Sequence, residues 1–352
     1  MTTVFLNGKF FGGPDDPPIT QARVGAFDAG LQHAVGLFET MLGGVSTAQE
    51  PDSTGAAQET ETWVLQLDEH LERLASSAKE LGLSDQIRTA ALAEAIVSTV
   101  TRSGLARARV RLTITGGDLS MLAATQAGGP RSVDPTVMIV AQPATQYPAA
   151  MFERGVMMSI ADAKANPFNP AEGHKTLNYW WRLRELQLAA AKGAGEALVL
   201  SVTNHLCSGC VSNVLLVKGD TLYTPIARGQ ERGETPQETT VSGVPVAPRG
   251  ASGSNGQNGE NGENGGAMVL PSPVLPGVTR AWAMRKAEMM GYAAEARNLG
   301  VSDLLEADEV FLSNSSWGVL PVVALEAARI GDGKPGRLTM DLRDAWLDLL
   351  PE

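Results

Sequence analysis

Lys175 stands in a sequence context that suits covalent chemistry. It follows Gly173 and His174, and it precedes a strongly helical stretch rich in aromatic residues, "LNYWWRLRELQLAAAKGAG". A lysine amine forms imines with aldehydes, and its pKa falls when the side chain leaves water. A cation is disfavoured at the positive end of a helix dipole, so a lysine at the start of this helix is unusual as a mere surface charge. An ordinary solvated lysine remains the alternative on local sequence alone.

Three further segments carry groups suited to binding the phosphate of a cofactor. "LPGVTR" is a Pro-Gly turn that runs into a helix, so the amides of Gly277, Val278 and Thr279 could point at an anion. "LSNSSWG" supplies hydroxyls, including that of Ser315, directly after a predicted strand. "HLERLASSA" places Arg73 beside a core-facing leucine, where a guanidinium can be partly buried. Each segment alone is a weak signal.

The composition excludes some classes of partner. The 352 residues are 43% hydrophobic and 19% charged, and they contain no apolar run of the roughly twenty residues that a membrane span needs. The net charge of −11 argues against a nucleic-acid partner, since such binders usually carry a basic face. The first residues show no export signal, and two cysteines suit a reducing compartment. We therefore expect a soluble, cytoplasmic protein.

Two polar segments interrupt the predicted core. Residues 46–62 are small, polar and acidic, and residues 227–268 are rich in Gly, Asn, Gln and Pro. Such composition cannot offset the entropy lost on ordering. We expect both segments to be surface insertions without chemistry, and the second to be disordered.

Strands and helices mix elsewhere without the regular alternation of a parallel sheet. "VFLNGKFF" predicts a hairpin, residues 68–83 and 279–290 predict helices, and "ARVRLTIT", "TVMIVA" and "DEVFLS" predict strands. Residues 196–225 predict further hairpins. Prolines in "QPATQYPAAM" favour an extended connection. We expect a small N-terminal α+β domain (1–142), an interdomain linker (143–149) and a large C-terminal α+β domain (150–352).

Together these segments resemble the class IV aminotransferase family, in order along nearly the whole chain. The similar blocks are "GLFETML", "HLERLASSA", "HKTLNY", "SGCVSNVLLVKGDTLYTP", "LPGVTR" and "ADEVFLSNSSWGVLPV". The resemblance implies an α+β, two-domain fold like that of D-amino-acid aminotransferases. It also implies pyridoxal 5′-phosphate bound between the domains, an amino-acid-like substrate and a homodimer.

The resemblance also assigns expected roles to residues. Lys175 would bond the cofactor aldehyde and carry the proton during the reaction. Thr40 and Asn314 would face the substrate. The remaining expected cofactor contacts are Arg73, Tyr179, Ser208, Gly277, Val278, Thr279 and Ser315. No metal is expected.

Three places depart from the family pattern. Ser208 stands where the family places a glutamate against the pyridine nitrogen. A serine can hydrogen-bond that nitrogen but does not stabilise its protonated form, which makes the ring a weaker electron acceptor. Gly116 stands where relatives often carry an arginine for the substrate carboxylate. His33 and Val35 replace a tyrosine and an acidic residue.

The terminal block "NSSWGVLPV" is closer to that of the deoxychorismate lyases than to those of the aminotransferases. The leading expectation is therefore release of pyruvate and 4-aminobenzoate from aminodeoxychorismate, a reaction of folate biosynthesis. An amino-acid transaminase for branched-chain or D-amino acids is the alternative. A third possibility is a catalytically impaired binding protein that lost the glutamate at position 208.

Cys207 and Cys210 have the C-x-x-C spacing of metal and redox sites. The chain has no second such pair, so we expect small buried residues beside the cofactor instead. His33 and His174 are expected near the pocket, as hydrogen-bonded neighbours rather than catalysts.

Overall fold

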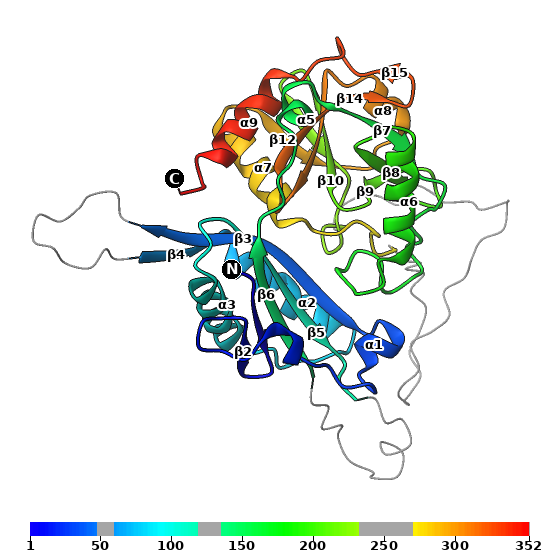
Figure 1. The fold of residues 1–352 in the computed structure, drawn as a ribbon. Helices are drawn as coiled ribbons and strands as arrows, with labels where there is room; N and C mark the ends of the chain where they lie inside the picture. Colours follow the sequence, from blue (N-terminus) through cyan, green and yellow to red (C-terminus); the bar gives the residue numbers. More distant parts are fainter. Residues whose placement is uncertain (48–59, 119–134, 232–269, 352) are drawn as a thin grey trace, which may run out of the picture.

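Two β-sheets covered by helices form the two lobes of the molecule (Figure 1). The computed structural model describes residues 1–47, 60–118, 135–231 and 270–351. The first lobe holds the N-terminal strands, and the second lobe holds the described helices and strands after the crossing near residue 145. This arrangement confirms the predicted α+β class.

The first sheet is antiparallel, in the order β2-β1-β6-β5-β3-β4. Its strands are β1 (Thr3–Leu6), β2 (Lys9–Phe11), β3 (Gly36–Thr47), β4 (Thr60–Val64), β5 (Ala108–Thr115) and β6 (Val137–Pro143). The short helices η1 (Ile19–Gln21) and α1 (Ala29–His33) precede β3. Helices α2 (Leu67–Glu80) and α3 (Thr89–Ser103) share one apolar core with β3, β5 and β6. The helices therefore cover one face of this sheet.

The second sheet follows the order β12-β11-β10-β13-β14-β7-β8-β9, with β15 beside β14. Its strands are β7 (Val156–Ile160), β8 (Glu196–Leu200), β9 (Leu206–Gly209), β10 (Asn213–Lys218), β11 (Thr221–Thr224), β12 (Ala293–Ala296), β13 (Glu309–Asn314), β14 (Gly318–Leu325) and β15 (Ala328–Arg329). The helices are α5 (Ala149–Glu153), α6 (Trp180–Ala191), α7 (Val278–Met289), α8 (Val301–Leu305) and α9 (Arg337–Leu347).

Strand β10 shows how this sheet is buried. Val214 and Leu216 pack into one core cluster, while Leu215 and Val217 pack into another beneath α7 and α9. The strand is apolar from Val214 to Val217 because both of its faces meet packed side chains there. Among the described helices, none combines the length and the apolar content that crossing a membrane requires.

Several local predictions are confirmed. Asn7 and Gly8 have positive φ values of 45° and 86°, as the tight turn between β1 and β2 requires. The predicted helix over 68–83 is α2, and Gly82 follows its end in the left-handed region. "ARVRLTIT" forms β5 over the predicted residues.

The boundaries predicted for the two insertions are wrong at their described ends. Ser46 pairs with Glu61 between β3 and β4, so the first predicted segment begins and ends inside strands. Ala227 is fully buried, and Gln230 accepts a hydrogen bond of 3.0 Å from buried Arg280. The start of the second segment therefore belongs to the packed fold. Residues 48–59 and 232–269, which make up the rest of the first predicted insertion and nearly all of the second, lie outside the described residues, and so does the disorder predicted for the second.

The chain leaves the first sheet at Pro143 and enters α5 at Ala149. We propose this crossing, residues 143–149, as the boundary between domains 1–142 and 150–352. The segment that leads into α7, yellow in Figure 1, runs between the two lobes. It is one side of the cavity described next.

Candidate active site

A cavity of about 480 Å³ opens between the two lobes, within the size range of small-molecule sites. The residues expected from the sequence to bind cofactor or substrate all line it: Thr40, Arg73, Lys175, Tyr179, Ser208, Gly277, Val278, Thr279, Asn314 and Ser315. The fold thus gathers residues that are up to 275 positions apart in the chain. Their individual roles remain predictions.

The segment that carries Lys175 is extended, which corrects the expectation of a lysine in the first turn of a helix. Helix α6 begins only at Trp180. The carbonyl of Lys175 accepts a hydrogen bond from the Phe38 amide at 2.9 Å, and the Leu177 amide donates to Gly36 at 3.0 Å. The lysine is therefore fixed against strand β3 of the first lobe, and the helix-dipole argument does not apply to it.

Gly173 permits the turn before the lysine. Its φ of +79° lies in the left-handed region, and a Cβ atom there would come within 2.8 Å of the Ser272 carbonyl oxygen. Aromatic rings then surround the Lys175 amine, which lies 4.5 Å from the centre of the Phe38 ring and 5.6 Å from that of Tyr179. These rings are themselves in edge contact at 5.2 Å. They orient the amine toward the cavity without neutralising it.

The N-terminus of α7 presents backbone amides to the cavity. Gly277 is its N-cap residue, and no side chain caps the helix. A Cβ atom at this position would lie 1.9 Å from Oδ1 of Asn213, so only glycine fits. Because the first amides of a helix need acceptors and carry the positive end of its dipole, this turn suits an anion such as a phosphate.

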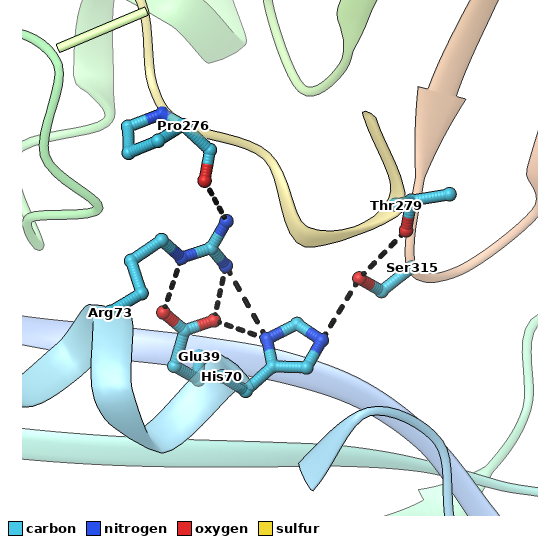
Figure 2. A network of polar contacts seen from close by, with 6 residues as sticks. All are labelled: Glu39, His70, Arg73, Pro276, Thr279 and Ser315. Atoms are coloured by element: carbon cyan, nitrogen blue, oxygen red, sulfur yellow. Dashed lines mark hydrogen bonds and ion pairs between the residues drawn. The ribbon is translucent and has the colours of Figure 1, made fainter. Parts of the chain in front are cut away.

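A polar network connects this turn to the first lobe (Figure 2). Arg73 on α2 donates to both carboxylate oxygens of Glu39 on β3, at 2.9 and 2.5 Å. It also donates to the Pro276 carbonyl at 3.0 Å. His70 contacts Glu39 through Nδ1 at 2.7 Å and Ser315 through Nε2 at 3.2 Å. The guanidinium still has free N–H groups for a phosphate, because it carries five donors.

Burial and the neighbouring residues determine the protonation states of Glu39 and His70 in this network. Burial alone would raise the pKa of Glu39, but the charge of Arg73 and the hydrogen bond from His70 lower it to about 2. Burial lowers the pKa of His70, and nearby Arg73 and Lys175 act in the same direction. His70 is therefore neutral, and it donates through Nδ1 to the ionised Glu39.

The tautomer of His70 has a consequence for Ser315. Since Nδ1 carries the proton, Nε2 accepts a hydrogen bond from the Ser315 hydroxyl. Ser315 can in turn accept from Thr279, whose Oγ1 lies 3.3 Å away. Both hydroxyl protons are then engaged in this chain of hydrogen bonds, and a role for Ser315 in binding the phosphate stays a prediction.

Three cavity arginines were not foreseen from the sequence. Arg109 and Arg111 alternate along β5, so both side chains project from the same face, and Arg182 lies on α6. The Arg111 guanidinium stacks 3.8 Å from the Phe38 ring centre. Burial and the charge of Arg109 lower the pKa of Arg111. The Arg-Val-Arg alternation in a half-buried strand was the available signal.

The donors of the cavity fit an anionic cofactor that carries an aldehyde. Five cationic side chains and no acidic side chain are found among its lining residues; the cations are Arg73, Arg109, Arg111, Lys175 and Arg182. Ser313 and Trp317 are also lining residues, and their Oγ and Nε1 atoms are buried without a hydrogen-bond partner in the described structure. Such groups need a ligand or water to satisfy them. Lys175 supplies the amine that an aldehyde requires.

The remaining expectations have mixed outcomes. His174 lines the cavity, and its Nδ1 lies 2.9 Å from Ser77 Oγ, but His33 lies outside the cavity lining. Cys207 and Cys210 are buried as expected, and burial raises the pKa of both thiols to about 12. Both thiols are therefore protonated at neutral pH.

Comparison with known proteins agrees with this architecture. Residues 36–233 and 263–325 match the family model described as amino-transferase class IV. The branched-chain-amino-acid aminotransferase of Escherichia coli K12 is 25% identical over 284 residues, which cover 80% of this chain and 77% of that protein. The solved structure of E. coli branched-chain amino acid aminotransferase superposes with a TM-score of 0.74 at 21% identity, covering 99% and 94% of the two chains. That of 4-amino-4-deoxychorismate lyase from Pseudomonas aeruginosa gives 0.66 at 24% identity, covering 98% of each.

We predict that the Glu39→Gln variant changes how stability depends on pH. The lowered pKa of Glu39 stabilises the fold above about pH 4.5, and this contribution is lost as pH falls toward 2. The variant should lose about 3 kcal/mol at pH 7, since a buried ion pair is broken, and the difference from wild type should shrink below pH 4.5. Urea denaturation across this range measures both quantities.

The exposed Glu72→Gln variant on the same helix is the control, and its stability should follow wild type. The low pKa of His70 also weakens the fold in acid, so both proteins should lose stability below its ordinary value of 6.5. A gap between Glu39→Gln and wild type that stays constant from pH 7 to 3 would contradict the assignment.

Proposed function

This chain belongs to the amino-transferase class IV family, and we propose that it is a lyase similar to 4-amino-4-deoxychorismate lyase. The members of this family are pyridoxal-phosphate-dependent enzymes that act on amino-acid-like substrates. One observation carries the proposal: a lysine amine lies in a cavity with four arginines and no acidic lining residue within the described chain. Such a cavity suits an anionic cofactor together with an acidic substrate.

We propose that pyridoxal phosphate lies between the lobes. Its phosphate would be held by Arg73 and by the amides of Val278 and Thr279, with Gly277 leaving room for the close approach. Ser315 would support Thr279. Bound there, the cofactor supplies an aldehyde for amines and a ring that withdraws electrons from the substrate α-carbon.

Lys175 would act at the α-carbon of the substrate. Its backbone is fixed by β3 and its amine by two aromatic rings, so it can remove a proton from that carbon and hold it. Tyr179 lines the same wall and would contact the cofactor hydroxyl. In the lyase reaction the enolpyruvyl oxygen then leaves from the β-carbon, and the ring of the product becomes aromatic.

Arg109 and Arg111 would recognise the substrate. Neither side chain has an ion-pair partner in the described part of the chain, although both line the cavity. They replace the arginine that is absent at Gly116. Aminodeoxychorismate carries carboxylates on its ring and on its enolpyruvyl group, which matches two arginines. Thr40 and Asn314 would contact the same substrate.

A transaminase is the second candidate. The named relatives include branched-chain-amino-acid aminotransferases, and apolar groups of Leu177, Leu183 and Trp317 in the lining could hold an apolar side chain. We also propose a homodimer, because Trp180 and Leu183 beside the cavity are 80% and 48% exposed in the single chain. A cytoplasmic location stays a prediction.

We predict that Lys175 is the residue bonded to the cofactor. Borohydride reduction of the protein with pyridoxal phosphate, followed by peptide mass mapping, should find the pyridoxyl group on this lysine. The Lys175→Ala variant should lose both the label and the visible absorbance band. The Lys192→Ala variant, altered at an exposed lysine in the same region, should keep both. A label elsewhere, or no binding at all, would leave the binding-protein alternative.

The reaction type is tested by the requirement for a second substrate. The lyase should release pyruvate and 4-aminobenzoate from aminodeoxychorismate without any added oxo acid. A transaminase would instead convert L- or D-amino acids only when 2-oxoglutarate or pyruvate is present. Amino-group transfer at rates well above pyruvate release would reject the lyase proposal and establish the second candidate.

We predict that Arg111→Gln weakens substrate binding. The charge-assisted hydrogen bonds of a guanidinium are worth roughly 1.5–3 kcal/mol, so KM should rise roughly ten-fold to one-hundred-fold, with a smaller change in kcat. Steady-state kinetics measure both constants. Arg107→Gln, exposed just before β5, is the matched control and should behave as wild type. An unchanged KM in Arg111→Gln would exclude this arginine from substrate recognition.

A further inference from the structure

Ser208 and Arg182 form a contact at one end of the cavity. Arg182 Nη1 lies 3.3 Å from Ser208 Oγ and 3.4 Å from the Gly209 carbonyl, and its Nη2 lies 3.0 Å from Glu172 Oε2. The guanidinium also rests on the Trp181 ring at 4.4 Å. Ser208 is 5% exposed, and both residues line the cavity. The contact is therefore buried and faces the ligand space.

The direction of this hydrogen bond is fixed by chemistry. A guanidinium stays protonated and can only donate, so Ser208 Oγ must be the acceptor. The hydroxyl proton of Ser208 is then left over, and no acceptor for it is found among the described residues. Ser208 consequently presents a donor to the cavity. A carboxylate at this place would present only acceptors.

The described charged residues around Ser208 also place no acidic side chain in the cavity lining at this end. Glu172 is engaged by Nη2 of Arg182, whereas Nη1 of the same guanidinium contacts the serine. Glu196, on the neighbouring strand β8, accepts from the Val211 amide at 3.2 Å and from Ser212 Oγ at 2.9 Å, and it does not line the cavity. Burial raises the pKa of Glu196, which disfavours its charged form. The charge nearest to Ser208 is therefore positive.

We propose that Ser208, oriented by Arg182, donates a hydrogen bond to the pyridine nitrogen of the bound cofactor, and that the Arg182 charge keeps this nitrogen unprotonated. This inference rests on the proposed function and on the family resemblance, which implies that Ser208 stands against that nitrogen. Arg182 is a positioning residue, because it acts through Ser208 and through its field. An unprotonated ring withdraws electrons less strongly, which favours expulsion of a leaving group over full transamination.

The ring nitrogen can be observed directly. Pyridoxal phosphate labelled with ¹⁵N in its ring is bound to the wild-type protein, and its NMR shift is recorded between pH 6 and 8. We expect the shift of a neutral pyridine throughout. In Ser208→Glu, the carboxylate should move the shift to that of a pyridinium. A pyridinium shift in the wild type would overturn the inference.

The role of Arg182 needs a separate comparison. Arg182→Gln in a Glu172→Gln background removes the charge without leaving an unpaired carboxylate, and it should raise the pH at which the nitrogen protonates by about one unit or more. The Arg182→Lys variant, which keeps the positive charge, should give the wild-type NMR shift of the ring nitrogen. Arg184→Gln, exposed on the same helix, is the control and should change nothing. An unaltered titration in the double variant would remove Arg182 from the inference.

The visible absorbance band of the lysine-bound cofactor shows whether a negative result contradicts this inference alone or the proposed function as well. When the band is present but the nitrogen is protonated, the inference about Ser208 and Arg182 fails and the proposed function stands. When the band itself is absent in wild type, the proposed function fails and takes this inference with it.

Discussion

The buried ion pair between Glu39 and Arg73 is the interaction on which the cavity depends. Both residues belong to the first lobe, yet a third donor of Arg73 reaches the Pro276 carbonyl in the second lobe, directly before the anion-binding turn of α7. The pair therefore aligns the two walls of the cavity. Without Glu39, the nearly buried guanidinium would face an uncompensated desolvation penalty beside other cations. This one ion pair therefore fixes the relative position of the two walls and balances the charge of Arg73.

A cavity whose charged lining residues in the described chain are all cations destabilises the protein while it is empty. Like charges within a poorly solvated space repel; burial lowers the pKa of Arg111 most, and the neighbouring charge of Arg109 lowers it further. Packing would tolerate apolar side chains at these positions on β5, because the strand already has a buried opposite face. These unfavourable positive charges therefore indicate that a negatively charged ligand binds in the cavity. Unpaired polar groups at functional sites usually indicate a ligand in the same way.

Much of the fold could be predicted from local patterns, whereas several of the expected lining residues, such as Thr40 and Ser208, were assigned only through the family resemblance. The Asn7-Gly8 turn, the helix of Arg73 and strand β5 follow from turn chemistry and periodicity, which act over a few residues. The conformation of Lys175 could not be predicted, because its segment is held by hydrogen bonds to β3, more than 130 positions earlier. The contact between Arg182 and Ser208 joins a helix to a strand, and only the folded chain brings these two residues together.

Some of the cavity cations have an acidic ion-pair partner within the described chain and others have none, and this difference bears on the charge that a substrate should carry. Arg73 is paired with Glu39 and Arg182 with Glu172, so neither arginine needs a substrate carboxylate as its ion-pair partner. The charge that remains lies on Lys175, which would bond the cofactor, and on the two arginines of β5. A phosphate at α7 would not neutralise those arginines, since in the proposed site it would be held by helix amides and by Arg73. A substrate with one carboxylate would leave one arginine of β5 unpaired, whereas an acidic substrate with two would satisfy both. The two arginines of β5, unpaired in the described structure, therefore favour the proposed aminodeoxychorismate, or a dicarboxylic amino acid in a transaminase, over a purely apolar amino acid.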